Sequence, residues 1–174
     1  MNRGQPYDGR PGGPGSYGGP DRGRFQGRDD RRPQPPSGPD QDFAGLLEAK
    51  VDVRAPAIEL FDSTAQEIAK RLADAGRDVN KSSQLRRFYD EIIRHVDAHR
   101  ETSNAEGDKA RFQRDLPFIR LICAHAAYAK TRKHVDANFV AFLQHGLRQV
   151  DTPEHLRMLR TLFEAVIGFM PKKS

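Results

Sequence analysis

The chain has 174 residues, a formal net charge of +5 and a single cysteine, Cys123. One cysteine excludes an intrachain disulfide and a zinc site built on cysteines. No apolar stretch is long enough to span a bilayer and no apolar signal region opens the chain, so we expect a cytoplasmic protein without a membrane partner. The basic balance favours an anionic partner.

Residues 1–40 differ in composition from the rest of the chain. They hold 10 of the 15 glycines, 8 of the 12 prolines and almost no aliphatic side chains. Such a segment buries too little apolar surface to offset its ordering entropy, which predicts a disordered, low-complexity tail. Its Arg-Gly pairs are typical of segments that touch RNA loosely, whereas its composition alone favours a solubilising linker. We expect a linker or poorly defined segment over 41–60 and one helical domain over 61–174.

Apolar residues recur at helical spacing through that domain, and no credible strand appears. Leu85, Phe88 and Ile92 show the pattern best, on one face of a helix. Thr152 before Pro153 marks the start of the last helix, as a cap followed by proline at the first position. The predicted helices cover about 63–75, 82–100, 106–114, 116–133, 136–149 and a final segment from 153 onward. The sequence therefore predicts an all-α fold, a compact bundle of about five to six helices.

The helix predicted over 116–133 is apolar around most of its circumference, which favours a position at the centre of the bundle. Pro117 suits the first turn of this helix. Its least apolar strip contains Ala124 and Ala127, whose small side chains permit close approach of another helix.

Two basic clusters lie within residues 77–133, which carry 13 Lys and Arg against 8 acidic residues. The first opens the helix predicted over 82–100, and the second ends the helix predicted over 116–133. Hydroxyl, amide and cationic side chains beside the amides of a helix N-terminus suit a phosphate group. The first cluster contains Lys81, Ser83, Gln84, Arg86 and Arg87, and the second contains Lys130, Arg132 and Lys133.

Each cluster also has a purely structural interpretation. Arg86 can pair with Asp90 and Arg87 with Glu91, four residues further along the helix. The cations of the second cluster complement the dipole at a helix C-terminus. The pattern alone leaves open whether the two clusters share one surface.

No constellation of residues indicates an enzyme. His95 and His99 have a spacing that can hold a metal ion, but no glutamate or cysteine pair completes the site. The chain has no nucleophile elbow and no phosphate-binding glycine loop. We therefore expect no catalytic residue, no metal and no cofactor.

Three segments in this order resemble one known family. Ser82-Ser-Gln-Leu-Arg-Arg-Phe-Tyr89 resembles the Thr/Ser-Ser-Gln-Leu/Ile-Arg-Lys-Phe signature of the small helical subunit of type III-A CRISPR effector complexes, the second of the Csm proteins. Residues 116–132 are similar to a second signature, which ends in Tyr-Ala-x-x-Arg, and residues 163–169 to a C-terminal Phe-Glu-Ala-Ile/Val segment. The resemblance covers about residues 78–170.

The resemblance implies a non-catalytic, RNA-binding subunit of an antiviral complex. Several adjacent copies would form a filament along the guide RNA–target RNA duplex, next to the other subunits. Arg86 and Arg87 match the basic pair of the first signature, and Gln84 matches its glutamine. Arg132 matches the arginine that closes the second. Charge and position add three further candidates for RNA binding, Lys81, Lys130 and Lys133.

The alternative hypothesis is a helical protein–protein adaptor with an RNA-independent role. In that case the residues of the basic clusters form surface ion pairs and interact with the dipole at a helix C-terminus. Assembly that survives nuclease treatment and high salt would distinguish the adaptor from the RNA-binding subunit.

Overall fold

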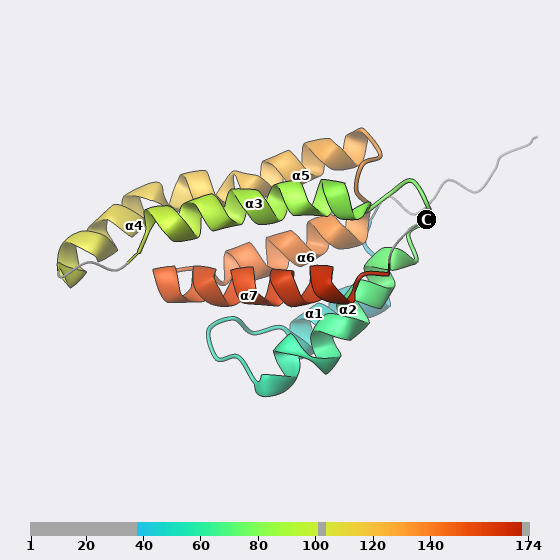
Figure 1. Ribbon diagram of the computed structural model, residues 1–174, viewed down its shortest axis with the longest axis horizontal. Helices are drawn as coiled ribbons and strands as arrows, with labels where there is room; N and C mark the ends of the chain where they lie inside the picture. Colours follow the sequence, from blue (N-terminus) through green and yellow to red (C-terminus); the bar gives the residue numbers. More distant parts are fainter. Residues whose placement is uncertain (1–37, 101–103, 172–174) are drawn as a thin grey trace, which may run out of the picture. The chain divides into compact units, whose positions relative to one another are not determined.

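A computed structural model of the protein describes residues 38–100 and 104–171. These residues form α-helices and one short 3₁₀ helix, with no strand among them (Figure 1). The all-α prediction is therefore confirmed, while the tail predicted over 1–40 lies outside the described residues except for its last three. The elements are α1 (Gln41–Lys50), η1 (Ile58–Phe61), α2 (Ser63–Ala73), α3 (Ser82–Ala98), α4 (Ala105–Arg120), α5 (Ile122–Thr131), α6 (Ala137–Arg148) and α7 (Pro153–Phe169).

Four predicted helices agree with α2, α3, α6 and α7 to within about two residues. Local caps explain two of the boundaries. The Asp136 carboxylate accepts a hydrogen bond from the Phe139 amide at 2.8 Å, and the Thr152 hydroxyl accepts one from the His155 amide at 3.2 Å. Pro153 follows at the first position of α7. These caps satisfy amides that have no partner within the helix.

Aromatic side chains join α3, α6 and α7 in the core. The ring of Phe139 lies 5.2 Å from that of Phe88 and 5.8 Å from that of Phe163, between centroids. Phe142 and Tyr89 meet Phe163 edge-on at 5.5 and 5.9 Å. Each such pair adds roughly 0.5–1.5 kcal/mol beyond the burial of its area. Because Phe88 and Tyr89 fix the inner face of α3, the opposite face of that helix points to solvent.

Residues 41–60 form a folded part of the domain, which differs from the predicted linker. Phe43 and Leu47 of α1 are buried in the core. The Gln149 side chain donates to the Val51 carbonyl at 2.9 Å and accepts from the Val53 amide at 2.8 Å. The sequence pattern misses this segment because long-range hydrogen bonds to the end of α6 hold it, and these leave no local periodicity.

The region around Pro117 also differs from the prediction. Instead of opening a new helix, Pro117 lies inside α4, which continues to Arg120. The break comes at Leu121, whose amide donates to the carbonyls of Pro117 and Phe118 at 3.1 and 3.2 Å before α5 begins. Proline lacks an amide hydrogen, so α4 loses one backbone hydrogen bond at Pro117 but continues for about another turn.

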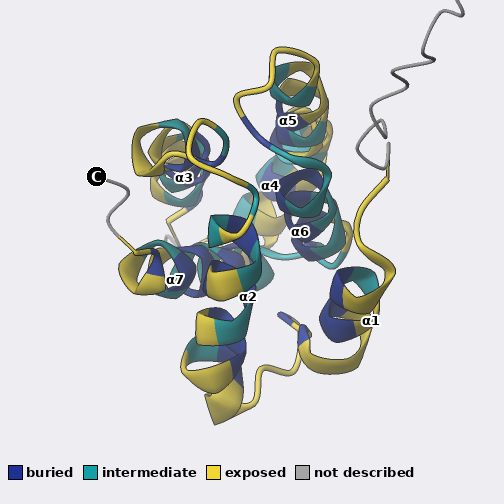
Figure 2. Cartoon of the chain, turned by 90° about the vertical axis from the view of Figure 1, so that its right-hand side faces the viewer, coloured by how far each residue is buried: buried dark blue, intermediate teal, exposed yellow. Residues whose placement is uncertain are grey.

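The α4–α5 segment lies at the edge of the bundle, not at its centre. Phe118, Leu121 and Tyr128 are exposed, and only Ile122 and Ala126 of α5 are buried. The central helix is α6, in which every residue except the last is buried or partly buried (Figure 2). The prediction that the helix over 116–133 lies at the centre of the bundle is therefore wrong. Its residues are apolar around most of the circumference, but neighbouring elements cover only one side of α5.

Candidate nucleic-acid interface

The start of α3 and the end of α5 are held together by a buried asparagine. Asn80 has no solvent exposure and lies in the connection between α2 and α3. Its side-chain amide group donates to the Leu72 carbonyl at 3.0 Å, and its side-chain carbonyl accepts from the Asp136 amide at 3.1 Å. The backbone amide of Asn80 donates to the His134 carbonyl at 3.0 Å. One residue thus links the α2–α3 connection to the α5–α6 connection.

A second contact joins the two connections at the surface. Gln84 accepts from the Lys81 amide at 3.3 Å, so its side-chain amide nitrogen faces His134 Nδ1 at 3.2 Å. Since an amide nitrogen can only donate, Nδ1 of His134 is the acceptor in this contact. A hollow of about 260 Å³ lies beside this contact, lined by Ser83, Gln84, Arg87, Phe88, Ala129 and His134. The first basic cluster and the two residues that flank the second, Ala129 and His134, therefore meet at one hollow.

The arginines of the first cluster do not form the surface ion pairs that their spacing allows. Arg86 and Arg87 are exposed, and neither pairs with an acidic group in the described part of the chain. Glu91 instead contacts Nδ1 of His125, on α5, at 2.9 Å. Lys81 lies next to Asp78 at 3.1 Å. Lys81 therefore has an acidic neighbour, whereas the charges of both arginines remain available to a ligand.

The second cluster adopts a helix-terminating turn with a strained residue. Lys133 has a φ of 59°, in the left-handed region that favours glycine. Its amide donates to the Lys130 carbonyl at 2.9 Å, and the next amide, of His134, donates to the Ala129 carbonyl at 3.0 Å. This hydrogen-bond pattern ends many helices, with glycine at the left-handed position. A lysine there costs about 1 kcal/mol relative to glycine, which is consistent with a role for its cation.

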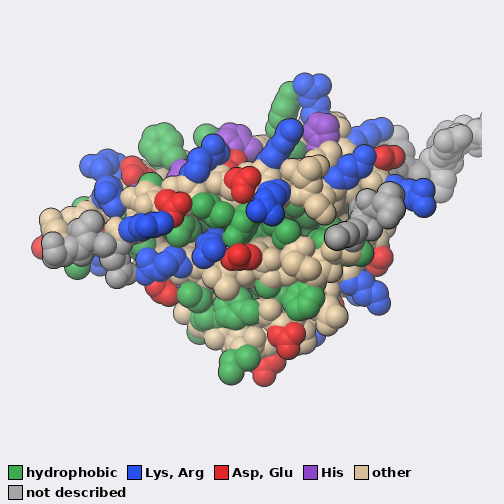
Figure 3. All heavy atoms as spheres, viewed as in Figure 1, with side chains coloured by type: hydrophobic (Ala, Val, Ile, Leu, Met, Phe, Trp, Pro, Cys, Tyr) green, Lys and Arg blue, Asp and Glu red, His purple; other side chains and the backbone are tan. Residues whose placement is uncertain are grey.

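Tyr128 and Arg132 form a pair one helical turn apart. The Arg132 guanidinium lies 5.4 Å from the centre of the Tyr128 ring, and its Nε donates to the tyrosine hydroxyl at 3.2 Å. Tyr128 is 61% exposed. Figure 3 shows Lys and Arg side chains over α3 and the adjoining region, with Asp and Glu side chains interspersed among them.

Not every predicted RNA-binding residue lies at the same place. Gln84 and Arg87 line the hollow, and Lys133 immediately precedes His134, which lines it too. Arg86 lies about 100° around the helix axis from Arg87. Lys130 lines a different hollow, between α5 and α6. Sequence reasoning did not select Tyr128 or His134, although both lie within or directly beside the second cluster.

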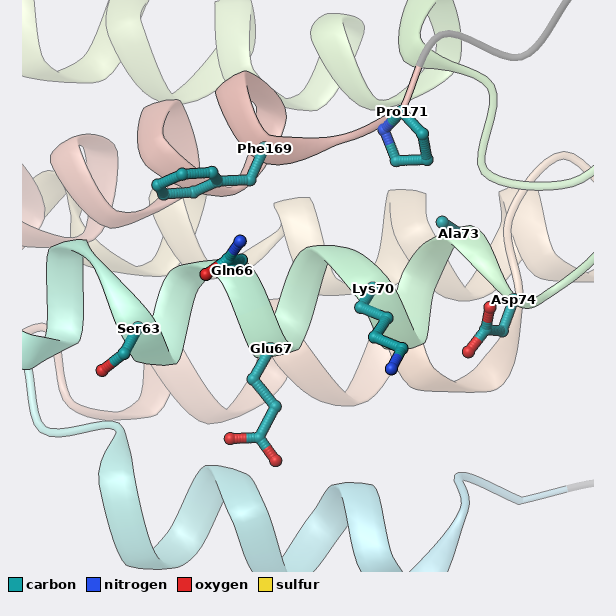
Figure 4. Close-up of a pocket in the computed structure, with 8 residues that line it drawn as sticks. All are labelled: Ser63, Gln66, Glu67, Lys70, Ala73, Asp74, Phe169 and Pro171. Atoms are coloured by element: carbon teal, nitrogen blue, oxygen red, sulfur yellow. The ribbon is translucent and has the colours of Figure 1, made fainter.

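The largest of the described hollows lies away from this surface. It has a volume of about 440 Å³ between α2 and the end of α7, and Figure 4 shows Phe169 and Pro171 above the α2 side chains that line it. Its charged residues are Glu67, Lys70 and Asp74. None of the predicted site residues lines it.

The groups suited to metal binding or nucleophilic chemistry are dispersed. In the described residues no three His, Cys, Asp or Glu side chains come together. His99 is buried against Phe112, with its ring centroid 5.1 Å away, and burial lowers its pKa. Burial raises the pKa of the Cys123 thiol, which keeps it in the less nucleophilic form. No described helix is both long and apolar enough to cross a membrane.

Comparison with known proteins matches the chain to a protein family. The model of the Csm2 Type III-A family matches residues 55–170, about two thirds of the chain. The matched region begins after α1 and contains α2 to α7 with both basic clusters. No curated protein and no solved structure matches the chain.

Proposed function

The chain belongs to the type III-A Csm2 family and is a small subunit of the type III-A CRISPR Csm complex, and we propose that it holds RNA in that complex without performing catalysis itself. The RNA is the duplex of guide and target. Its backbone lies over the surface where the start of α3 meets the end of α5, and adjacent copies of the subunit continue this surface along the duplex.

The observation that carries this proposal is the junction made by Asn80 and His134. Beside this junction one hollow is lined by residues of the first cluster and by Ala129 and His134, which flank the second. Arg87 borders the hollow there without an acidic partner among the described residues. Cations that are not neutralised within the protein gain most from a phosphate, because binding releases the counterions of the nucleic acid.

The contacts are expected to be insensitive to sequence. Arg and Lys side chains recognise the phosphates and the 2′-hydroxyl surface of an A-form duplex, whose deep major groove is closed to side chains. Sequence selection in guide-directed complexes comes from base pairing. This subunit therefore contributes affinity and position, through Arg86, Arg87, Arg132 and Lys133, and its role is that of a scaffold.

The test is the salt dependence of RNA binding by the double variant Arg86→Ala/Arg87→Ala. We expect weaker binding and a slope of log K against log salt that is smaller by about two at most, since each phosphate contact contributes about 0.7–0.9. A matched control is Lys70→Ala/Arg148→Ala, which removes the same charge from exposed positions outside the hollow. Equal affinity and slope in both folded double variants would disprove the assignment.

A protein–protein role is the second candidate, and the exposed side chains of Phe118 and Leu121 favour it. As a Csm complex subunit, the protein associates with other subunits of that complex. If apolar contacts alone carry the association, then nuclease treatment and high salt leave the complex intact. If RNA carries part of it, then the subunit dissociates under those conditions.

A further inference from the structure

We propose that Tyr128 stacks on an unpaired base of the bound RNA, while Arg132 positions the ring and contacts the adjacent phosphate. The proposal rests on the RNA-binding function given above and adds a contact of a different chemical kind. It names single-stranded or extruded nucleotides as the ligand, because the bases within a duplex are already stacked on each other.

The geometry of the pair fits a stacking platform. The Arg132 Nε hydrogen bond to the Tyr128 hydroxyl, at 3.2 Å, draws the guanidinium toward the hydroxyl end of the ring. Its carbon is 5.4 Å from the ring centre, so the cation is offset from the middle of the ring. With 61% of the residue exposed, much of the aromatic surface remains accessible. The ring is therefore held in place and still open to a flat ligand.

The residues around Tyr128 favour binding of a polyanion at this site. The residues three and four positions away along the chain are Ala124, His125, Thr131 and Arg132, none of which is acidic. The acid on α3 that contacts this turn, Glu91, is engaged by His125 at 2.9 Å. An aromatic ring beside a cation is a combination with which proteins bind single-stranded nucleic acid.

Phe118 provides an internal comparison. It is exposed to 64%, similar to Tyr128, and also lies on the α4–α5 segment. However, its neighbours one turn away include both Arg114 and Asp115, and no cation–π contact to its ring is found among the described residues. If exposure alone determined RNA contact, then both aromatic positions would behave alike.

The absence of tryptophan from the chain makes the contact directly measurable. Tyr128→Trp places a single fluorophore at the proposed platform, and Phe118→Trp places one at the comparison site. Each full-length variant is titrated with a 5′-labelled single-stranded RNA of about 12 nucleotides, a length typical of such sites. The anisotropy of the label reports binding, and tryptophan fluorescence reports stacking in the same sample.

We expect the tryptophan fluorescence of the Tyr128→Trp variant to be quenched along the anisotropy curve, while that of the Phe118→Trp variant stays unchanged. In parallel, Tyr128→Phe keeps the ring but lacks the hydroxyl that Arg132 holds, so it should lose less affinity than Tyr128→Leu, which should lose roughly five- to a hundredfold, the range typical of one stacked base. RNA binding by Tyr128→Trp without quenching, or equal affinity for Tyr128→Leu, would overturn the stacking contact and leave the proposed function in place.

Two further outcomes also decide the matter. A lack of binding of the single-stranded RNA by the unsubstituted protein would overturn the stacking contact, and a lack of binding of an RNA duplex as well would also overturn the proposed function. A fluorescence change in both tryptophan variants on raising the protein concentration without RNA would show that the exposed part of α4–α5 is a contact between copies of the chain, which also excludes base stacking at Tyr128.

Discussion

The backbone amide of Asn80 donates to the His134 carbonyl at 3.0 Å, so the residue just before the first basic cluster is bound to the residue just after the second. The proposed RNA surface depends on this contact, because it holds the start of α3 beside the end of α5. The two connections that meet here have no regular secondary structure, and buried polar groups determine their geometry.

Asn80→Ala should destabilise the protein by about 2–4 kcal/mol. The substitution leaves the Leu72 carbonyl and the Asp136 amide without their partner, and each buried unsatisfied group costs about 1–3 kcal/mol. Asn80 also has a φ of 55°, so Asn80→Gly should be less harmful than Asn80→Ala. Urea unfolding measures both. Equal stability of Asn80→Ala and the unsubstituted protein would show that the junction holds without this side chain.

Lys133→Gly should separate stability from RNA binding. Glycine relieves the left-handed φ of 59°, so we expect a gain of about 1 kcal/mol in the free energy of unfolding, while Lys133→Ala gives little change. Both variants lack the cation and should bind RNA with equally reduced affinity. The account of Lys133 as a functional cation is wrong if Lys133→Gly binds RNA as tightly as the unsubstituted protein.

Stability should fall as the pH drops below about 6.5, in part because of His99. Burial is the largest cause of the lowered pKa of this residue in the folded state. At a pH between the ordinary pKa of 6.5 and the lowered pKa of the folded state, the unfolded chain binds a proton that the folded chain does not. The free energy of unfolding therefore decreases. His95 has a pKa lowered by the same cause.

The check is the free energy of unfolding between about pH 7.5 and 5.5, a range that spans the ordinary histidine pKa, for the unsubstituted protein and for His99→Leu. The variant should lose less stability over this range, and the remaining slope should include the part from His95. A variant whose pH dependence is as steep as that of the unsubstituted protein would remove His99 from the explanation.

Two glycines should respond to alanine in opposite directions. A Cβ at Gly146, in the buried α6, would collide with a methyl carbon of Leu159, so Gly146→Ala should destabilise by about 1–3 kcal/mol. A Cβ at Gly168 meets no atom within 4 Å, and Gly168→Ala should stabilise α7 by up to about 1 kcal/mol. Thermal unfolding of both variants compares them. The packing between α6 and α7 would need revision if both substitutions were equally tolerated.

The elements that sequence predicts well are those with local causes. A regular apolar stripe determines α3, a capped start followed by proline helps to determine α7, and the chain itself displays both features. By contrast, α1 and the segment after it depend on Gln149, which lies nearly a hundred residues further on and bonds to Val51 and Val53. No pattern within 41–60 indicates that partner.

The candidate site also has features that the sequence predicts and features that depend on the tertiary fold. Charge and motif identify the basic residues, but the partner of each charge depends on the tertiary fold. The spacing of Arg87 and Glu91 permits an ion pair, yet His125 approaches from α5 and contacts Glu91 instead. Tyr128 lies in an apolar segment, and its exposure follows only from the position of α5 at the edge of the bundle.

The central claim is that the surface at the start of α3 and the end of α5 touches RNA in the cell. The most direct measurement is ultraviolet crosslinking in the native host, followed by affinity purification, sequencing of the bound RNA and mass spectrometric identification of the crosslinked peptides. The account predicts guide RNAs crosslinked to peptides from residues 82–94 and 122–134. Protein partners recovered without enriched RNA, or crosslinks confined to other segments, would contradict it.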